Sequence, residues 1–227
     1  MNLPPWSFSM LDMFSSCPRK AFHKYLLKEK EPESEAMRKG NIFDKAMEAR
    51  LKNGTPLPAE YATWNDKAAS VASFCEKGAK LATQMKLGIT KEFKPCGFFD
   101  KDVWGRGALD VLILNYPTAI VLDWKTGKNN EGKPWYNGGL QLKIFTAFVL
   151  KHHPKIDKIL AFNVYEKEYG KPLQFTRDDQ KTLWQEILPK IIKIEEAFKK
   201  QEWLPCKGPL CNFCSVITCN FHPEKKL

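Results

Sequence analysis

Three features are missing from this sequence, and each absence excludes a class of protein. No stretch approaches the run of about 18 apolar residues that a membrane-spanning helix requires. The opening residues, MNLPPWSFSM, lack the basic and apolar segments of a secretory signal. There is no internal repeat and no low-complexity linker. We therefore expect a cytoplasmic protein with no membrane partner, folded as a single domain.

Negative charge is scarce relative to positive charge. The 36 Lys and Arg residues outnumber the 26 Asp and Glu residues, which leaves a formal net charge of +10 over 227 residues. Such an excess favours a polyanionic partner, with nucleic acid first and an anionic membrane surface second. The alternative is a basic protein whose charge serves only its solubility.

The spacing of apolar residues predicts an α/β fold in which helices flank a mixed β-sheet. Expected helices cover two short pieces within 7–29 and residues 35–52, 64–87, 138–151 and 177–201. Expected strands cover residues 90–95, 103–114, 118–124 and 157–166. The inward side chains that we expect on the helices 35–52 and 64–87 are Met37, Ile42, Phe43, Met47, Leu51, Val71, Phe74 and Leu81.

The stretch IVLDWKTGK, residues 120–128, combines an apolar strand with charged side chains at its end. Asp123 and Lys125 flank Trp124, so an extended chain points both charges to one face and the indole to the other. Asp110 occupies the preceding strand, and a hairpin of the two strands brings both carboxylates together. Convergent carboxylates repel each other unless a cation lies between them, and Mg²⁺ suits such a pair while keeping places for water and phosphate oxygens. This pattern predicts a metal site in which Lys125 holds the attacking water; the simpler alternative is an exposed Asp and Lys pair.

The order of these residues resembles the signature of the PD-(D/E)XK nuclease superfamily. That signature is an acidic residue in one strand, followed in the next by Asp or Glu, any residue and Lys, which Asp110 and residues 123–125 match. The chain is similar to the RecB-like branch, which includes the nuclease domains of RecB and AddB, CRISPR-adaptation nucleases and phage exonucleases. The segment SFSMLDMFSSCPRKAFHKYL resembles the N-terminal stretch of that branch, and the resemblance runs from residue 7 to 221.

The resemblance implies a metal-dependent DNA nuclease, and specifically an exonuclease acting on single-stranded DNA or duplex ends. It assigns catalytic roles to Asp110, Asp123, Lys125 and Gln141. It assigns Mg²⁺ or Mn²⁺ to the side chains of Asp44, Asp110 and Asp123 and to the peptide carbonyl of Trp124. Recombination, repair, phage replication and CRISPR adaptation all use this fold, so the pathway stays open.

Two positions depart from the pattern of the branch. Asp44, four residues after Gly40, stands where the branch has a metal-binding His, and a carboxylate there adds negative charge and alters the metal preference. Phe145 stands where the branch has a Tyr, four residues after Gln141, so that hydroxyl is absent. These departures support the alternative function, a nucleic-acid-binding module that has lost efficient catalysis.

Seven cysteines in a reducing compartment, an odd number, argue against a disulfide framework. In the iron–sulfur members of the branch, one N-terminal and three C-terminal cysteines hold a [4Fe-4S] cluster that joins the chain ends. The resemblance extends this role to Cys17, Cys211, Cys214 and Cys219. Four thiolates also suit structural Zn²⁺, as in a zinc-stapled interaction protein, and unligated buried cysteines are the third alternative. Cys206 is a spare candidate ligand, and Cys75 and Cys96 are interpreted as structural.

The resulting prediction for the organisation of the chain is one RecB-like nuclease domain covering residues 1–227. Residues 35–201 form its leading helix and nuclease core, and residues 7–29 and 202–221 form a terminal clip joined by the cysteines. Aromatic side chains near the motif are candidates for stacking on bases of a single strand, with packing as the alternative explanation. These are Trp104, Trp124, Trp135 and Tyr136.

Overall fold

The structure, a computed structural model, describes residues 2–76, 78–133 and 136–223, without the side chains of residues 75 and 76. The chain forms two compact units. The terminal unit comprises Met1–Glu33 and Gln185–Leu227, and the central unit comprises Ser34–Trp184. The sequence predicts one nuclease domain with a terminal clip made of the two chain ends, and this organisation stays a prediction. No helix in the described part of the chain has the length and apolar character needed to cross a bilayer.

The central unit is built on a six-stranded mixed sheet, which confirms the predicted fold class. The strands follow the order β2-β1-β3-β4-β5-β6, and β4 and β5 form the parallel pair within an otherwise antiparallel sheet. A parallel pair needs a crossover, and the helix between β4 and β5 supplies it. The strands are β1 (Lys80–Ile89), β2 (Pro95–Cys96), β3 (Gly105–Asn115), β4 (Thr118–Lys125), β5 (Lys158–Tyr165) and β6 (Leu173–Thr176).

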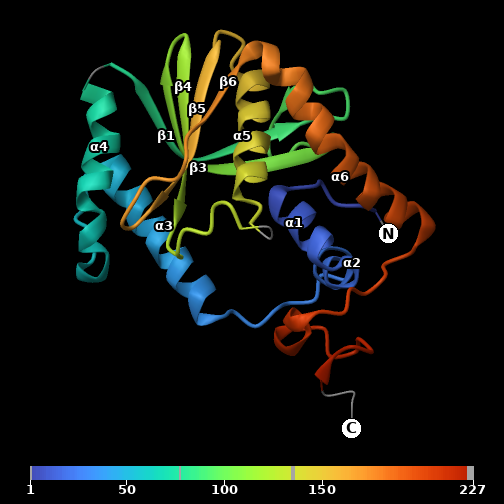
Figure 1. Cartoon of the computed structure of the whole chain (residues 1–227). Coiled ribbons are helices and arrows are strands. Elements are labelled where there is room, and N and C mark those ends of the chain that lie inside the picture. The colour runs from blue at the N-terminus through green and yellow to red at the C-terminus, as the bar shows by residue number, and fades with distance from the viewer. Residues whose placement is uncertain (1, 77, 134–135, 224–227) are drawn as a thin grey trace. The chain divides into compact units, whose positions relative to one another are not determined.

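Helices cover both faces of this sheet, as Figure 1 shows. On one face, α3 (Glu35–Asn53) and α4 (Asn65–Glu76) follow each other through the 3-10 turn η2 (Ala59–Trp64). On the other face lies the crossover helix α5 (Gly138–His152). After β6, the 3-10 turn η3 (Arg177–Asp179) leads into α6 (Gln180–Lys200), which continues into the terminal unit. The apolar core beneath α3 and α4 includes Phe43, Met47, Trp64, Val111, Ile113, Leu122 and Trp124.

Helix α3 carries Asp44 and has clear start and stop signals. The hydroxyl of Ser34 accepts a hydrogen bond from the Met37 N–H at 3.2 Å, and Gly54 ends the helix with a left-handed φ of 71°. Phe43 is fully buried, as predicted. The predicted inward positions of Met37 and Ile42 are wrong, because these side chains are 46% and 38% exposed. Both residues come before Phe43 and Met47, the buried residues of this helix.

The prediction of one helix over residues 64–87 is also wrong. Helix α4 ends at Glu76, and β1 runs from Lys80 to Ile89. The segment has a period of two, with Leu81, Thr83, Met85 and Leu87 alternating with other residues, and this is the pattern of a strand. The predicted strand 90–95 is a turn instead, and only Pro95–Cys96 pairs, as β2.

The terminal unit brings the two ends of the chain together. Its N-terminal part contains α1 (Phe8–Ser16), α2 (Pro18–Ala21) and the π-helix η1 (Phe22–Leu26), and its C-terminal part contains η4 (Pro209–Phe213). Glu31 pairs with Lys20 at 2.8 Å and Lys24 at 2.6 Å and accepts a hydrogen bond from the Ser215 hydroxyl at 3.1 Å. Burial opposes the charge of Glu31, but the two ammonium groups outweigh it and lower its pKa to about 2. Glu31 therefore ties the C-terminal segment to the N-terminal helices.

Candidate functional site

The β3–β4 hairpin brings Asp110 and Asp123 together. Val111 pairs with Leu122 across the two strands, so the two aspartates occupy the next positions along them. The Trp124 N–H donates to Asp110 Oδ2 at 2.9 Å, which fixes the first carboxylate against the backbone of the motif. The predicted hairpin is thus present, and it places both acids on neighbouring strands in the middle of the sheet.

The side chains of the motif alternate between the two faces of β4. The Trp124 indole packs with Trp64 in the core beneath α3 and α4, with ring centroids 5.9 Å apart. Asp123 and Lys125 point the other way and meet Gln141 from the first turn of α5. Stacking of Trp124 on a base is therefore excluded by its burial, and the alternative explanation, core packing, holds for this residue.

Asp123, Lys125 and Gln141 form a closed triangle of polar contacts. Gln141 Nε2 donates to Asp123 Oδ1 at 2.8 Å, and Lys125 Nζ donates to Gln141 Oε1 at 2.8 Å. Lys125 Nζ also lies 2.5 Å from Asp123 Oδ2. One side of the Gln141 amide thus donates and the other accepts, which holds the ammonium and the carboxylate in a defined relative position.

The electrostatics of this site disfavour three ionised carboxylates. Burial and then the charge of Asp123 raise the pKa of Asp110 to about 8, against the lowering effect of the Trp124 N–H. Burial raises the pKa of Asp123 despite the opposing ammonium of Lys125. Burial and the charge of Asp123 also raise the pKa of Asp44, a half-buried residue on α3. The three acids therefore feel one another's charge, which is the situation that a bound cation relieves.

Lys125 alone provides too little positive charge for this group. Burial opposes its ammonium form, but the Asp123 carboxylate outweighs that cost and raises the pKa of Lys125. Asp123 Oδ2 is buried and accepts no hydrogen bond of regular geometry, although Lys125 Nζ is close to it. Carboxylate oxygens and an unsatisfied buried oxygen fit a hard divalent cation. The donor oxygens of Asp44, Asp110 and Asp123 do not all lie within 4.8 Å of one another, so ligation requires small side-chain movements.

Gln84 on β1 is a member of the site that the sequence did not reveal. Its Nε2 donates to Asp110 Oδ1 at 3.2 Å. Its φ of 49° lies in the left-handed region, which a non-glycine residue adopts at a cost. The prediction of a helix over this segment hid Gln84, whereas the alternation of Leu81, Thr83, Met85 and Leu87 would have shown a strand beside Asp110.

A second polar group joins Tyr136, which was predicted near the motif and lies in the loop before α5, to two residues of β5 that the sequence did not reveal. Asn163 lies opposite Asp123 in the parallel register, and Tyr165 lies opposite Lys125. The Tyr136 hydroxyl receives a hydrogen bond from Asn163 Nδ2 at 2.7 Å and shares another with the Tyr165 hydroxyl at 2.8 Å. Tyr136 contributes to the electrostatic surroundings of Lys125. No sequence signal links these residues, because their proximity depends on the β4–β5 pairing. Trp135, also predicted near the site, lies outside the described residues.

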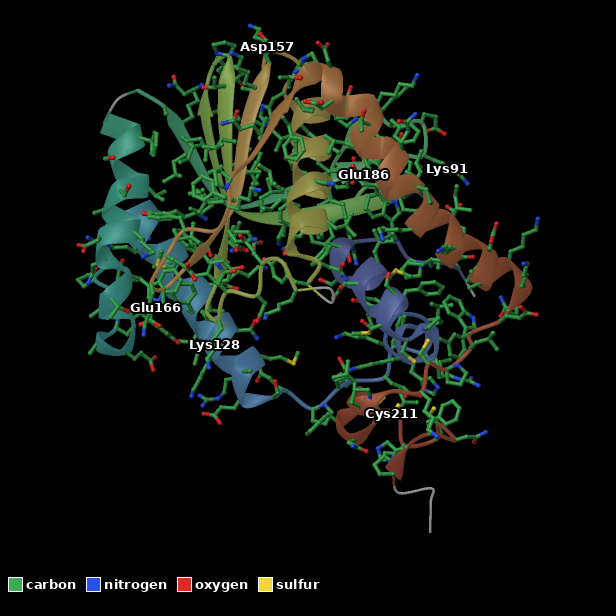
Figure 2. All side chains as sticks on the ribbon, viewed as in Figure 1. Lys91, Lys128, Asp157, Glu166, Glu186 and Cys211 are labelled. Carbon is green, nitrogen blue, oxygen red and sulfur yellow. The ribbon has the colours of Figure 1, made fainter. Side chains whose placement is uncertain are left out.

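Phe145 stands at a position where the branch has a Tyr, and Lys128 follows the motif in sequence. Phe145 is buried, and a Cβ added at Gly107 would lie 3.1 Å from its ring, so it packs against β3 and takes no polar role. Lys128 is exposed on the loop that follows β4, where Figure 2 labels it.

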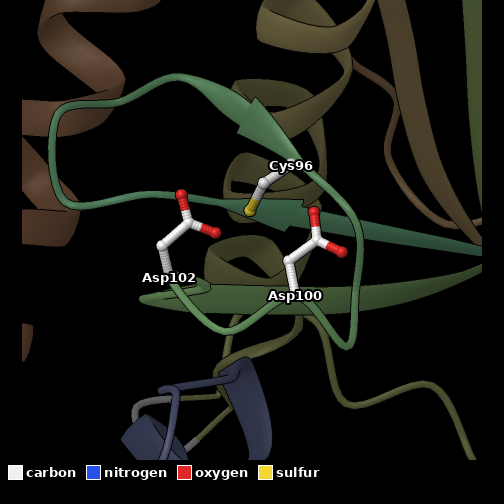
Figure 3. Close-up of side chains that lie close together, drawn as sticks. All are labelled: Cys96, Asp100 and Asp102. Atoms are coloured by element: carbon white, nitrogen blue, oxygen red, sulfur yellow. The ribbon is translucent and has the colours of Figure 1, made fainter.

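A different cluster of potential metal ligands lies in the loop around β2. Among the described residues, Cys96, Asp100 and Asp102 form the one group of three or more such side chains whose ligand atoms all lie within 4.8 Å of one another (Figure 3). Both aspartates are exposed, and Asp100 Oδ2 already accepts the Gly97 N–H at 2.6 Å. The hydrogen bond from Gly97 to Asp100 stabilises the turn that carries the two aspartates. Cys96 lies directly before this turn and belongs to the cluster.

The predicted cysteine ligands all belong to the terminal unit. Cys17, Cys211, Cys214 and Cys219 line one small cavity together with Cys206, and Figure 2 labels Cys211 there. The Cys206 N–H points to Cys17 Sγ at 3.5 Å, and the Gly208 N–H points to Cys211 Sγ at 3.4 Å. None of the six cysteines with described side chains forms a disulfide. Cys75, interpreted as structural, has no described side chain.

Comparison with known proteins gives matches over almost the entire chain. A model of the PD-(D/E)XK nuclease superfamily matches residues 5–219. The crystal structure of a protein named SSO0001 is similar with 18% sequence identity and a TM-score of 0.52, covering 99% of this chain and 88% of that chain. A candidate exonuclease from Eubacterium rectale is similar with 12% identity and a TM-score of 0.58, covering 92% and 86%. At these identities the structural matches establish the fold. No curated protein sequence matches the chain.

Proposed function

The chain belongs to the PD-(D/E)XK nuclease superfamily, and from this premise we propose that it is a divalent-metal-dependent deoxyribonuclease. The observation that carries the proposal is the linked set of Asp110, Asp123, Lys125 and Gln141 on this fold. A buried and a half-buried acid that both resist ionisation, with a lysine held beside them by an amide, are energetically costly, and such groups are typical of catalytic sites. The excess of positive charge suits a nucleic acid substrate.

The residues that would hold Mg²⁺ or Mn²⁺ are Asp44, Asp110 and Asp123, with the peptide carbonyl of Trp124 as a further ligand. When bound, the ion supplies Lewis-acid stabilisation of the negative charge that develops on the phosphate during an in-line displacement. The carboxylate of Asp44 suits this ion as well as an imidazole would, and its proximity to the other two acids is reflected in its raised pKa.

The protein's own groups have separable tasks in phosphodiester hydrolysis. A water oxygen forms the new bond to phosphorus and gives up a proton to solvent, while the bond from phosphorus to the leaving oxygen breaks and that oxygen takes a proton from solvent. Because the pKa of Lys125 is raised, its side chain stays an ammonium at neutral pH and acts as a hydrogen-bond donor to the attacking water instead of a base. Gln141 holds Lys125 at Asp123, and Gln84 and the Trp124 N–H hold Asp110. Tyr136 brings a hydroxyl to this region, where Phe145 provides none.

We further propose that the protein is a RecB-like exonuclease acting on single-stranded DNA or duplex ends. The support is the set of five cysteines that gathers at one cavity from both ends of the chain. Thiolates on one Zn²⁺ lie about 3.8 Å apart, because each Zn–S bond is about 2.3 Å in a tetrahedron. Among the cysteines with described side chains, no three sulfurs all lie within 4.8 Å of one another. This wider spacing, with N–H groups directed at two sulfurs, favours a [4Fe-4S] cluster over zinc.

Replacement of Cys17 by Ser should remove the cluster and destabilise the terminal unit, because this residue supplies the ligand from the N-terminal part. We expect loss of the broad visible absorbance of anaerobically purified protein, loss of bound iron and a lower melting temperature. Cys96→Ser is the matched control and should change none of the three. Stoichiometric zinc in the wild-type protein, without iron, would contradict the assignment to an iron–sulfur cluster.

The proposed function is tested by incubating anaerobically purified protein with end-labelled single-stranded and duplex DNA in Mg²⁺, Mn²⁺ or EDTA. We expect degradation with either ion and none in EDTA, with the sequence of labelled products giving the polarity. Binding of DNA without any metal-dependent cleavage would instead establish the nucleic-acid-binding module of the same fold.

A further inference from the structure

Strand β3 carries accessible positions between its first residues and Asp110. Arg106 and Ala108 are accessible, whereas Gly107 between them is buried. Alternate residues of a strand share a face, so Arg106 and Ala108 lie opposite Gly107, whose added Cβ would meet the ring of Phe145 on α5. Four residues at about 3.3 Å each place Arg106 about 13 Å from Asp110 along the strand.

Strand β1 extends the same face. Lys86 pairs with Ala108 and Gly88 with Arg106, so these positions share one face of the two strands. Lys86 is exposed. This face thus carries two cations, Lys86 and Arg106, at the end of β1 and β3 that is far from Gln84 and Asp110.

The loop after β2 folds over this far end. A Cβ added at Gly88 would lie 2.6 Å from the Gly97 carbonyl oxygen, so only glycine allows the loop to approach so closely. The approach positions the next two residues, Phe98 and Phe99, whose rings meet edge to face with centroids 4.9 Å apart. Phe99 remains 76% exposed, although a large aromatic side chain usually finds cover in a folded protein.

Both cations of the face lie against these rings. Lys86 Nζ is 5.8 Å from the Phe98 centroid and 5.4 Å from the Phe99 centroid, and the Arg106 guanidinium carbon is 5.1 Å from the Phe98 centroid. Such contacts keep long, mobile side chains close to the rings. The result is an exposed aromatic surface bordered by positive charge, which we call the β2 platform and define as Lys86, Phe98, Phe99 and Arg106.

We propose that the β2 platform binds single-stranded DNA, with a base stacked on Phe99 and the neighbouring phosphates held by Lys86 and Arg106. An aromatic face with flanking cations is the combination that binds unpaired bases regardless of sequence, because every base has a stacking face. Paired bases are stacked on each other and cannot use Phe99, so the β2 platform selects single strands. This inference rests on the proposed nuclease function, for which it supplies a hold on the substrate some distance from the acids.

The nearby aspartates set the side from which the strand approaches. Asp100 and Asp102 follow the rings in the same loop and are exposed, so they repel phosphates on their side. Lys86 and Arg106, from β1 and β3, attract phosphates on the other side of the rings. The charges therefore hold the backbone of a bound strand over β1 and β3 and away from the two aspartates.

The test measures binding of a fluorescein-labelled thymidine homo-oligonucleotide in EDTA, where cleavage cannot interfere. Phe99→Ala should weaken binding at least about fivefold, and Phe99→Trp should retain it, because tryptophan restores a stacking face.

Lys86→Ala should reduce the steepness of the plot of log affinity against log salt concentration by about 0.7, whereas Phe99→Ala should leave this slope unchanged. Lys80→Ala is the matched control for Lys86, since it is equally an exposed lysine of β1, and it should change neither quantity. Binding of a blunt duplex should be unaffected by Phe99→Ala.

The outcomes separate this inference from the proposed function. Unchanged oligonucleotide affinity in Phe99→Ala would overturn the β2 platform, even if the wild-type protein cleaves DNA. Equal losses for single strand and duplex, or a loss in Phe99→Trp as large as in Phe99→Ala, would overturn it as well. Binding that depends on Phe99, in a wild-type protein that cleaves nothing, would support the β2 platform and refute the nuclease.

Discussion

Replacement of Lys125 by Ala should lower the rate of DNA cleavage by about 10²- to 10³-fold, the typical loss when one preorganised donor is removed from a transition state. The ammonium is held 2.5 Å from Asp123 and 2.8 Å from Gln141, so no other described side chain in contact with Asp123 can take its place as a cation. Because Lys125 acts on the attacking water, the affinity for DNA in EDTA should be unchanged. Single-turnover cleavage and fluorescence anisotropy provide the two measurements.

Lys158→Ala is the matched control for this variant. Lys158 is exposed at the start of β5, opposite Thr118, at the other end of the parallel pair from Lys125. The Lys158→Ala variant should cleave DNA at the wild-type rate. Cleavage by Lys125→Ala at more than a small fraction of the wild-type rate would remove Lys125 from the reaction and reduce its contact with Asp123 to a structural ion pair.

Replacement of Asp110 by Asn should abolish cleavage and at the same time stabilise the metal-free protein. The pKa of Asp110 is about 8 in the folded protein, against about 3.9 in an unfolded chain. The folded state therefore binds the proton more tightly. Stability linked to this group is fully present below about pH 4 and is lost as the pH rises through about 8. An amide has no proton to lose, so the variant avoids this loss.

The gain in stability should reach the order of 2 kcal/mol near pH 8 in EDTA, as an estimate discounted for coupling to Asp123, and should vanish near pH 4. The Asn side-chain oxygen can still accept the Trp124 N–H, and the Gln84 amide can rotate to accept the new N–H. Urea unfolding at a series of pH values measures the difference. Asp178→Asn, at an exposed aspartate, should show none. A destabilised Asp110→Asn protein at pH 8 would mean that the carboxylate is well compensated without metal.

The same argument predicts how divalent ions affect the two proteins. A ligand that binds only the folded state raises its stability, so Mg²⁺ or Mn²⁺ should raise the melting temperature of the wild-type protein at pH 8. The ions should have little effect on Asp110→Asn, which lacks one of the proposed ligands. An equal shift in both proteins would place the bound ion elsewhere, for example at Cys96, Asp100 and Asp102.

Local signals account for the parts of the fold that the sequence predicted well. The β3–β4 hairpin follows from two apolar runs separated by Asn115, Tyr116 and Pro117, and α5 follows from a glycine pair and an apolar face. Within β4, the period of two was enough to place Asp123 and Lys125 on the face opposite Trp124. By contrast, the sequence predicts a helix where β1 lies, because Leu81 continues the helical spacing of Val71 and Phe74 from α4. Pairing with β3 in the sheet makes this segment a strand.

The sequence by itself determined which chemical groups this protein brings to its site, because Asp110, Asp123 and Lys125 stand at fixed spacing on strands that local patterning defines. The tertiary structure alone decided what surrounds them. Gln84, Asn163 and Tyr136 reach the site through β1–β3 and β4–β5 pairing, and the loop of Phe98 and Phe99 reaches its face through Gly88. Such neighbours are separated by tens of residues along the chain, and their proximity depends on strand register, which cooperative packing of the whole sheet sets.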